Sequence, residues 1–346
     1  MPARQTEAHG LEGRLLLAAF GVAASVASMA GDDKGIRGAG AVLALLIVSP
    51  SSEVFAGTAA GGLYHSSDGG ESWALAEGPL SGLFVGAIVA DSEDGALYAG
   101  TSGAGAFRSV DGGRHWSEST AGLDNLFVEA LAIDTGPPRA VYAATDGGVF
   151  RSLDGGASWT AFSDGLPEPA VTALAVAAKG ALYAGTRRLG VFRLDRGSGK
   201  WAPAAGGLPR GAVRGFAAHP SEPGTLYAAT EGGLFKTSSA GASWSPVNAG
   251  LTSSSLLTVA IDPASPARLH AIAVTGLFRS GNGGASWSRI DVGPGGSLLT
   301  AVAVGRDSGE TVLVGAEGAI LKSRDGGKSW RSVPLPQAPP VEEGEP

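Results

Sequence analysis

The side chains that could do chemistry in this sequence are carboxylates, arginines, tyrosines and histidines, because its 346 residues include no cysteine. Disulfides, thiolate metal sites and cysteine nucleophiles are therefore excluded. The five tyrosines all stand at corresponding positions of a repeated pattern, and the five histidines are scattered among repeat positions, turns and the N-terminal stretch. A metal site or a triad needs such residues to converge. We therefore expect no metal, no cofactor and no histidine-based catalysis.

Paired carboxylates are the remaining route to an active site. Glycoside hydrolysis places an acid and a base or nucleophile roughly 5 to 10 Å apart. The local sequence marks no pair of Asp or Glu residues for that geometry, although distant carboxylates could converge in the fold. The sequence does not decide whether the protein is an enzyme, but it favours a non-catalytic protein. If the protein is an enzyme, we expect a glycoside hydrolase.

All seven tryptophans stand in one register along the chain, 42 or 43 residues apart. A period of this length indicates one supersecondary unit of four short strands that packs on its neighbours. No tryptophan is left over, so the sequence predicts seven units, with the tryptophans as structural residues. The register consists of Trp73, Trp116, Trp159, Trp201, Trp244, Trp287 and Trp330.

The third unit shows the predicted strands most clearly. VEALAID (128–134), AVYAAT (140–145) and a third run that begins GVFRS (148–152) are separated by Gly, Pro and Asp turns. The first run is almost wholly apolar, as expected for an innermost strand that is buried on both faces. The second and third runs carry an aromatic residue at a fixed position in most units. The sequence therefore predicts an all-β fold, a seven-bladed β-propeller with four-stranded blades.

Between the third and fourth strands, four units carry the motif S-x-D-G-G-x-x-W, which resembles the Asp-box, or bacterial neuraminidase repeat. The resemblance covers nearly all of residues 42–335. Units four and five depart from it, with Arg196 and Ser239 at the aspartate position. The other five units have Asp68, Asp111, Asp154, Asn282 and Asp325 at that position.

The motif has a structural explanation. An Asp carboxylate can accept backbone N–H groups of a tight turn that the two glycines permit. The resemblance implies that these turns lie on the rim, on the face opposite any active centre. We therefore expect the Asp-box residues to be structural and not catalytic.

The repeat and the blade number are similar to those of photosystem II stability and assembly factors, which implies a non-catalytic scaffold. The LYAGT and GVFRSxDGG phrases also resemble xyloglucan-cleaving enzymes, but those set their catalytic aspartates between two tandem propellers. Sialidases share the Asp-box and use six blades, an arginine triad and a tyrosine nucleophile, whereas every tyrosine here occupies a repeat position. We expect a non-catalytic scaffold or binding module; the alternative is a secreted carbohydrate-active or glycan-binding propeller.

In a propeller, the loops between blades and those between second and third strands share one face, where ligands usually bind. Here these loops are short, which favours a flat macromolecular contact over an enclosed substrate. We expect a protein or a polysaccharide to bind this face. The candidates in the loops between second and third strands are Asp146, Arg187, Arg188, Glu231 and Glu317. The loops between blades add Phe84, Asp124, Phe127, Glu168 and Arg210.

Two charges interrupt the first strands at one equivalent position, where other units have Leu, Gly or Thr: Glu129 and Arg214. Buried charges persist only when they are compensated, so these residues either line the central channel or pair, and both are candidate ligand contacts. Another position, in the third strand, is basic in nearly every unit and predicts a repeated ion pair between blades. It holds His65, Arg108, Arg151, Arg193, Lys236, Arg279 and Lys322.

Residues outside the repeat carry the expectations on location. An apolar run at 15–30 ends in small residues and predicts a signal peptide, or a disordered leader, over 1–30, with a periplasmic or secreted protein. The acidic Glu7 and Glu12 keep a cytoplasmic alternative open, and the run is short for a stable membrane span. Residues 31–41 are a linker or a closing segment, and 336–346 form a Pro/Glu tail expected to be disordered.

A net charge of −7 argues against nucleic acid as a binding partner, and we expect the protein to be a monomer.

Overall fold

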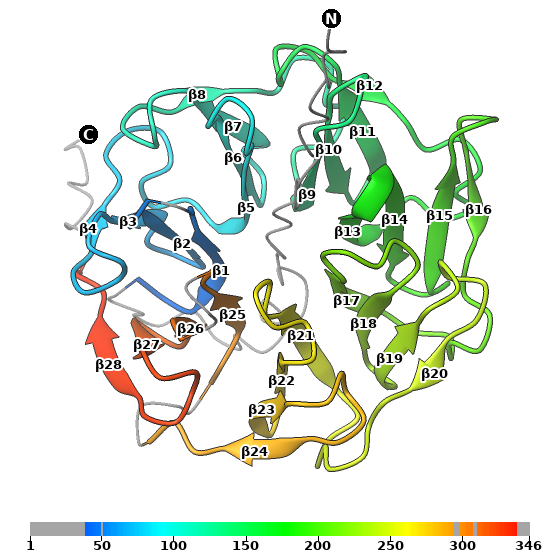
Figure 1. Ribbon diagram of the computed structural model, residues 1–346. Coiled ribbons are helices and arrows are strands. Elements are labelled where there is room, and N and C mark those ends of the chain that lie inside the picture. The colour runs from blue at the N-terminus through cyan, green and yellow to red at the C-terminus, as the bar shows by residue number, and fades with distance from the viewer. Residues whose placement is uncertain (1–38, 50, 294–297, 307–309, 338–346) are drawn as a thin grey trace, which may run out of the picture.

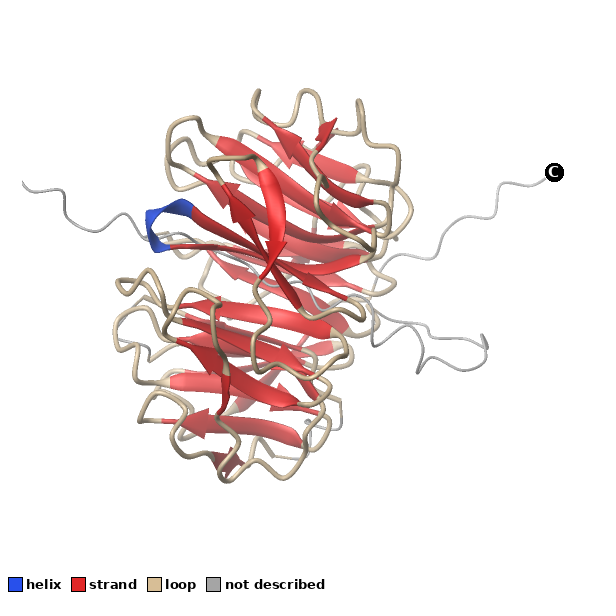
Figure 2. Cartoon of the chain, turned by 90° about the vertical axis from the view of Figure 1, so that its right-hand side faces the viewer, coloured by secondary structure: helices blue, strands red, loops and turns tan. Residues whose placement is uncertain are grey.

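The computed structural model describes residues 39–49, 51–293, 298–306 and 310–337, and their regular elements are all β-strands apart from one 3-10 turn. Seven four-stranded antiparallel sheets stand side by side in a ring, coloured in chain order in Figure 1. Seen from the side, loops and turns line the two faces of the ring (Figure 2). The predicted seven-bladed β-propeller is confirmed. The predicted leader at 1–30 and most of the predicted tail lie outside the described residues.

Each blade consists of four consecutive strands, numbered from the centre of the ring outward. The first strands are β1 (Val42–Ile47), β5 (Val85–Ala90), β9 (Val128–Asp134), β13 (Val171–Ala177), β17 (Val213–Ala218), β21 (Leu256–Ile261) and β25 (Ala301–Val304). The second strands are β2 (Val54–Thr58), β6 (Leu97–Thr101), β10 (Ala140–Thr145), β14 (Ala181–Thr186), β18 (Leu226–Thr230), β22 (Leu269–Ala273) and β26 (Val312–Gly315).

The third strands are β3 (Leu63–Ser66), β7 (Ala106–Ser109), β11 (Gly148–Ser152), β15 (Val191–Asp195), β19 (Gly233–Thr237), β23 (Gly276–Ser280) and β27 (Ala319–Ser323). The fourth strands are β4 (Ala74–Leu75), β8 (Ser117–Glu118), β12 (Thr160–Ala161), β16 (Lys200–Pro203), β20 (Ser245–Pro246), β24 (Ser288–Ile290) and β28 (Arg331–Pro334). One 3-10 turn, η1 (Ala178–Gly180), joins β13 to β14.

Burial follows the order of the strands. The first and second strands of blade 3, β9 and β10, are buried along their whole length, because blades cover both of their faces. Exposure begins in the third strand and is complete in the two-residue fourth strand β12. This explains why the inner runs of the sequence are nearly continuous in apolar residues instead of alternating.

A β-bulge interrupts the first strand of six blades near its beginning, where the register with the second strand skips one residue. A bulge leaves its extra residue outside the ladder and re-aims the side chain. The skipped position is the one that carries the two unexpected charges. Its residues are Leu43, Gly86, Glu129, Thr172, Arg214 and Leu257.

The tryptophans join neighbouring blades. Six of the seven are buried and Trp330 is partly buried. In four blades the indole N–H donates to a backbone carbonyl of the preceding blade at 2.7 or 2.8 Å. Removing such a buried aromatic side chain typically costs about 3–5 kcal/mol. These bonds run from Trp159 to Ser119, Trp201 to Phe162, Trp244 to Ala204 and Trp287 to Val247.

The basic position of the third strand has a different role from the one we expected. It lies directly across from the aromatic position of the second strand, so a cation faces a ring within one blade. Arg193 lies 6.0 Å from the centre of the Tyr183 ring, and Lys236 lies 5.3 Å from that of Tyr227. The predicted repeated ion pair between blades is therefore wrong as a repeat. Among the residues described, Lys322 alone from this position pairs with a neighbouring blade.

Blades 7 and 1 close the ring without exchanging a strand, since each sheet contains four consecutive strands. Within the described residues the ring is closed by packing of the two blade faces, and most of the predicted closing segment at 31–41 lies outside those residues. Tyr64 and Trp73 of blade 1 share an apolar cluster with Leu313 and Ile320 of blade 7. A short bridge between Ala41 and Glu317 adds a backbone link.

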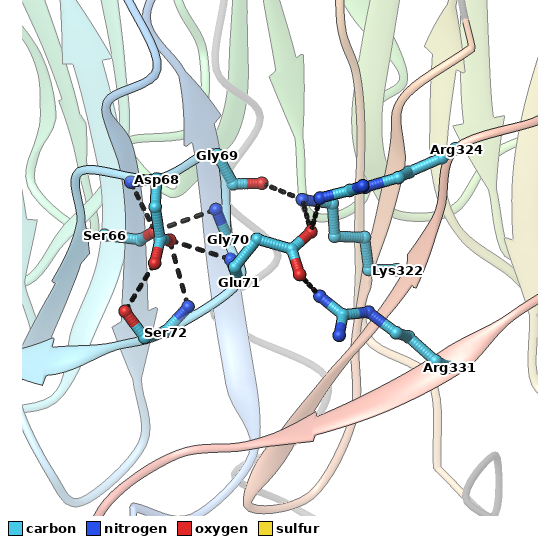
Figure 3. Close-up of polar contacts among 9 residues, drawn as sticks. All are labelled: Ser66, Asp68, Gly69, Gly70, Glu71, Ser72, Lys322, Arg324 and Arg331. Carbon is cyan, nitrogen blue, oxygen red and sulfur yellow. Dashed lines mark hydrogen bonds and ion pairs between the residues drawn. The ribbon is translucent and has the colours of Figure 1, made fainter.

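A cluster of charges reinforces this seam on its outer side (Figure 3). The carboxylate of Glu71, in blade 1, accepts a hydrogen bond from the Lys322 ammonium at 2.5 Å and also contacts Arg324 and Arg331. The Lys322 side chain is only 4% exposed, and it also donates to the carbonyl of Gly69. A buried cation without this carboxylate would be left uncompensated.

We therefore expect Glu71→Gln to lower the free energy of unfolding by about 1–3 kcal/mol, because it leaves the buried ammonium of Lys322 without its counter-charge. Urea unfolding measures the change. Glu118→Gln is the matched control, since Glu118 is exposed on β8 and has no ion pair among the residues described. Equal unfolding midpoints for Glu71→Gln and the wild type would contradict this role for the seam.

His270 fills the aromatic position of blade 6 and is fully buried, and neither of its ring nitrogens has a hydrogen-bond partner. In two other blades a tyrosine at this position donates to the carbonyl of the first motif glycine of the next blade, as Tyr227 does to Gly283 at 2.9 Å. Burial, with the charges of Arg279 and Arg268 adding to it, lowers the pKa of His270 to about 3. An unfolded histidine titrates near pH 6.5, so the stability contributed by neutral His270 is present above about pH 6.5. It is lost progressively as the pH falls toward 3.

His270→Tyr should stabilise the protein, because a tyrosine can donate to the corresponding glycine carbonyl, and should weaken the loss of stability between pH 7.5 and 5. Urea unfolding of both proteins at the two pH values gives the comparison. A wild type and a variant with parallel pH dependences would show that His270 does not contribute to the loss.

Candidate functional site

The two faces of the ring differ in what they contain. The top face is formed by the loops between blades and by those between second and third strands; the bottom face is formed by the other turns, including the Asp-box turns. On the bottom face, the Asp68 carboxylate accepts the backbone N–H groups of Glu71 and Ser72 at 2.8 and 2.9 Å (Figure 3). These bonds, with the hydroxyl of Ser72 as the largest cause, lower the pKa of Asp68 to about 2.

The other motif positions follow the same geometry to different degrees. Hydrogen bonds within the turn also hold the pKa values of Asp111, Asp154 and Asp325 well below their usual range. The Asn282 amide oxygen accepts the backbone N–H of Ser286, and the Ser239 hydroxyl accepts that of Ser243. Arg196 instead leaves its turn and pairs with Asp134 of blade 3. The Asp-box aspartates hold their own turns, and no hydrogen bond or ion pair among the described residues joins one of them to another; in another turn of this face, Asp91 and Asp94 share Arg139.

Two grooves of about 770 and 760 Å³ lie on the bottom face, between blades 4 and 5 and between blades 7 and 1. Among the residues described, each is lined by a single carboxylate, Asp195 in the first and Glu310 in the second. The described lining of neither groove therefore contains the two carboxylates of glycoside hydrolysis. In the described part of the chain, no group of three or more His, Cys, Asp or Glu residues is placed to hold a metal ion. No helix there is long and apolar enough to cross a membrane.

On the top face, three sequence candidates come together between blades 3 and 4. Arg187 donates to the Asp146 carboxylate at 2.8 Å, so the loops of two blades are joined by an ion pair. Both side chains are about two-fifths exposed, at 43% and 39%. Their charges act on Glu129, on the bulge of β9. Arg188 lies farther out, 3.7 Å from Glu168, and 80% of its side chain is exposed.

Glu129 is the most unusual residue of this group. It is only 7% exposed, and its Oε2 atom is enclosed without a hydrogen-bond partner. Burial, with the negative charge of Asp146 adding to it and Arg187 acting in the opposite direction, raises the pKa of Glu129 to about 7. A perturbed carboxyl with a specific charged neighbour at the end of a channel is a candidate functional group.

The charge of the largely buried Arg214 side chain is compensated by an ion pair. Its guanidinium donates to the Glu231 carboxylate at 2.8 Å, within blade 5, and to the Ser255 hydroxyl of blade 6 at 2.9 Å. It is therefore satisfied, and Glu231 lies at its exposed end. Glu317 is exposed far from both groups, on blade 7 at the seam, where its backbone bridges to Ala41.

The sequence identified Phe127 as a loop residue but missed its neighbour Leu126. Both are exposed, at 48% and 38%, which is uncommon for large apolar side chains beside a rigid core. The Leu126 carbonyl accepts the N–H groups of Gly103 and Gly105 from the loop of blade 2, and Ser102 bridges to Phe127. The pair is thus held in place by backbone bonds. Two adjacent apolar residues in an otherwise polar loop were the available signal.

No family model and no curated protein matches this sequence. Among solved structures, the fold is similar to YCF48 from Cyanidioschyzon merolae, with a TM-score of 0.65 and 17% identity over 84% of this chain and 97% of that one. It is also similar to YCF48 bound to D1 peptide (TM-score 0.62, 16% identity, 84% and 94%). A GH74 xyloglucanase from Xanthomonas campestris gives a TM-score of 0.57 and 18% identity, with 84% of this chain covering 59% of the enzyme. At these identities the likeness establishes the fold.

Proposed function

We propose that this propeller is a non-catalytic module that binds a polypeptide segment of a protein partner on its top face. The observation that carries the proposal is the exposed pair Leu126 and Phe127, which backbone bonds hold at the junction of blades 2 and 3. Apolar side chains that are ordered before binding lose little conformational entropy when a partner covers them. Exposed aromatic residues are also enriched at protein interfaces.

The polar surroundings of this pair support a protein contact. Asp146 pairs with Arg187, and both lie partly in solvent, so they can form the polar rim that surrounds an apolar contact. Val274, another large apolar residue that is 52% exposed, also lies on the top face, on blade 6. The loops of this face are short, which suits an extended segment lying across them better than an enclosed small molecule. YCF48, whose fold is similar, has been solved with a bound peptide.

The location and assembly state belong to the same proposal. An exported protein, periplasmic or secreted, and a monomeric ring are the states that we propose, and the solution mass of the purified protein tests the second. The partner is a protein and not a nucleic acid, since the chain carries a net charge of −7.

Phe127→Ser should weaken binding of peptides selected from a library of short random peptides by about tenfold or more, as expected for loss of a central aromatic contact. Fluorescence anisotropy of a labelled selected peptide measures the affinity. Val110→Ser and Leu153→Ser are matched controls, because these residues are 68% and 54% exposed on the Asp-box turns of the bottom face. If the control variants weaken binding and Phe127→Ser does not, the peptide binds the bottom face, and the proposal is contradicted.

A second function, glycoside hydrolysis, is favoured by one observation: the charge of Asp146 acts on Glu129, whose pKa is raised to about 7. A protonated acid beside a second carboxylate is the pairing that glycosidases use. Glu129 would donate the proton, and Asp146 would act as base or nucleophile. The ion pair of Asp146 with Arg187 argues for the binding module instead, because it occupies the carboxylate that would have to react.

This alternative predicts release of reducing sugar from at least one member of a broad polysaccharide panel. The activity should disappear in both Glu129→Gln and Asp146→Asn, because each removes one of the two carboxyl groups. A wild type that releases no reducing sugar from any polysaccharide of the panel would contradict a hydrolase at this site. Activity that survives both substitutions would contradict it as well.

A further inference from the structure

The residue at the bulge position of the first strand, or at the equivalent position immediately before β25 in blade 7, donates a hydrogen bond to the next blade in three blades. Thr172 donates through its hydroxyl to the Val213 carbonyl of the next blade at 2.6 Å. The hydroxyl of Thr300 donates in the same way to the carbonyl of Val42 across the seam. Arg214 contacts the carbonyl of Leu256 at 3.4 Å. Polar residues at this end of the channel therefore donate hydrogen bonds to the following blade.

Glu129 stands at the same position and cannot perform this task when ionised, because a carboxylate only accepts hydrogen bonds. No hydrogen bond or ion pair links Glu129 to any residue that the structure describes, and its Oε2 atom is enclosed. A buried carboxyl without a hydrogen-bond partner is destabilising. The charged groups that act on it are Asp146, on the loop after β10, and Arg187, on the loop after β14. Arg187 is already paired with Asp146, so no residue that the structure describes gives Glu129 a counter-charge of its own.

Apolar surface lies at the same end of β9. Phe127 immediately precedes this strand, two residues before Glu129, and is half exposed. A lysine or arginine side chain has an apolar stem and a cationic end, so it can cover an aromatic ring and place its charge beyond it. An exposed ring two residues before a buried carboxyl that no described residue compensates fits this chemistry.

We propose that Glu129 is the receptor for a basic side chain, lysine or arginine, of the polypeptide that docks on the top face. This inference rests on the proposed peptide-binding function and specifies the chemistry of its partner. The stem of the basic residue lies against Phe127 and Leu126, and its cation supplies the counter-charge that Glu129 lacks. A charge pair of this kind, largely removed from water, discriminates strongly between a basic and a neutral residue.

The binding is expected to be coupled to protonation. A cation favours the ionised form of Glu129, so a peptide that binds near neutral pH releases the proton that the raised pKa retains. Affinity should therefore decrease as the pH falls from 8 to 6. Calorimetry in buffers of different ionisation enthalpy measures the released proton directly.

The experiment uses the full chain and a library of short random peptides in which lysine and arginine are present or absent. Wild-type protein should select peptides with a basic residue, and replacing that residue by glutamine should weaken binding about tenfold or more. Glu129→Gln should remove this preference and the proton release, whereas Glu317→Gln, at an exposed carboxylate on the same face, should retain both. Glu129→Thr provides a second variant whose residue type already occurs at this position in blades 4 and 7.

The outcomes separate the two proposals. Selected peptides without a basic preference, which still depend on Phe127, would overturn the inference on Glu129 and leave the peptide-binding function standing. A basic preference that survives in both Glu129→Gln and Glu129→Thr would also overturn it. Failure to select any peptide with the wild-type protein would remove the proposed function itself.

Discussion

The structure depends on the contact between neighbouring blades, because no blade can bury its own inner strands. The first and second strands of blade 3, for example, are apolar ribbons with two faces to cover, and the adjoining sheets cover them. Tryptophan N–H groups and tyrosine hydroxyls fix the spacing by bonding to carbonyls of the adjoining blade. The seam between blades 7 and 1 must meet the same requirement without a shared strand. There the carboxylate of Glu71 compensates the buried Lys322.

The same constraint places the candidate site. The top-face side chains that matter come from the junctions of blades: Arg187 reaches back to Asp146, and Arg214 reaches forward to Ser255. A closed ring therefore presents these groups in one arrangement before any partner arrives. Among the residues described, none forms an ion pair with Glu129, and its Oε2 atom has no hydrogen-bond partner, which distinguishes it from the charged residues around it. That contrast, more than the general likeness to other propellers, points to a specific binding function.

The periodicity of the sequence was sufficient to predict the fold, because one tryptophan per unit and one aromatic position per strand have the same burial in every blade. It also assigned the loop residues to the correct face. It could not pair them, since the ion pair of Asp146 with Arg187 joins loops 41 residues apart, and their approach is set by the packing of two blades. The role of the basic third-strand position was mispredicted for a similar reason. The register between strands puts Arg193 opposite Tyr183 within one blade, and a ring satisfies the cation there.

The central claim is that a polypeptide binds the top face around the first strand of blade 3. Hydrogen–deuterium exchange of the protein with and without a selected peptide tests it most directly, because it maps the contact without any substitution. The account predicts slower exchange in residues 125–130 and 145–148, with the Asp-box turns unchanged. Protection confined to the Asp-box turns, or to the grooves between blades on the bottom face, would contradict it.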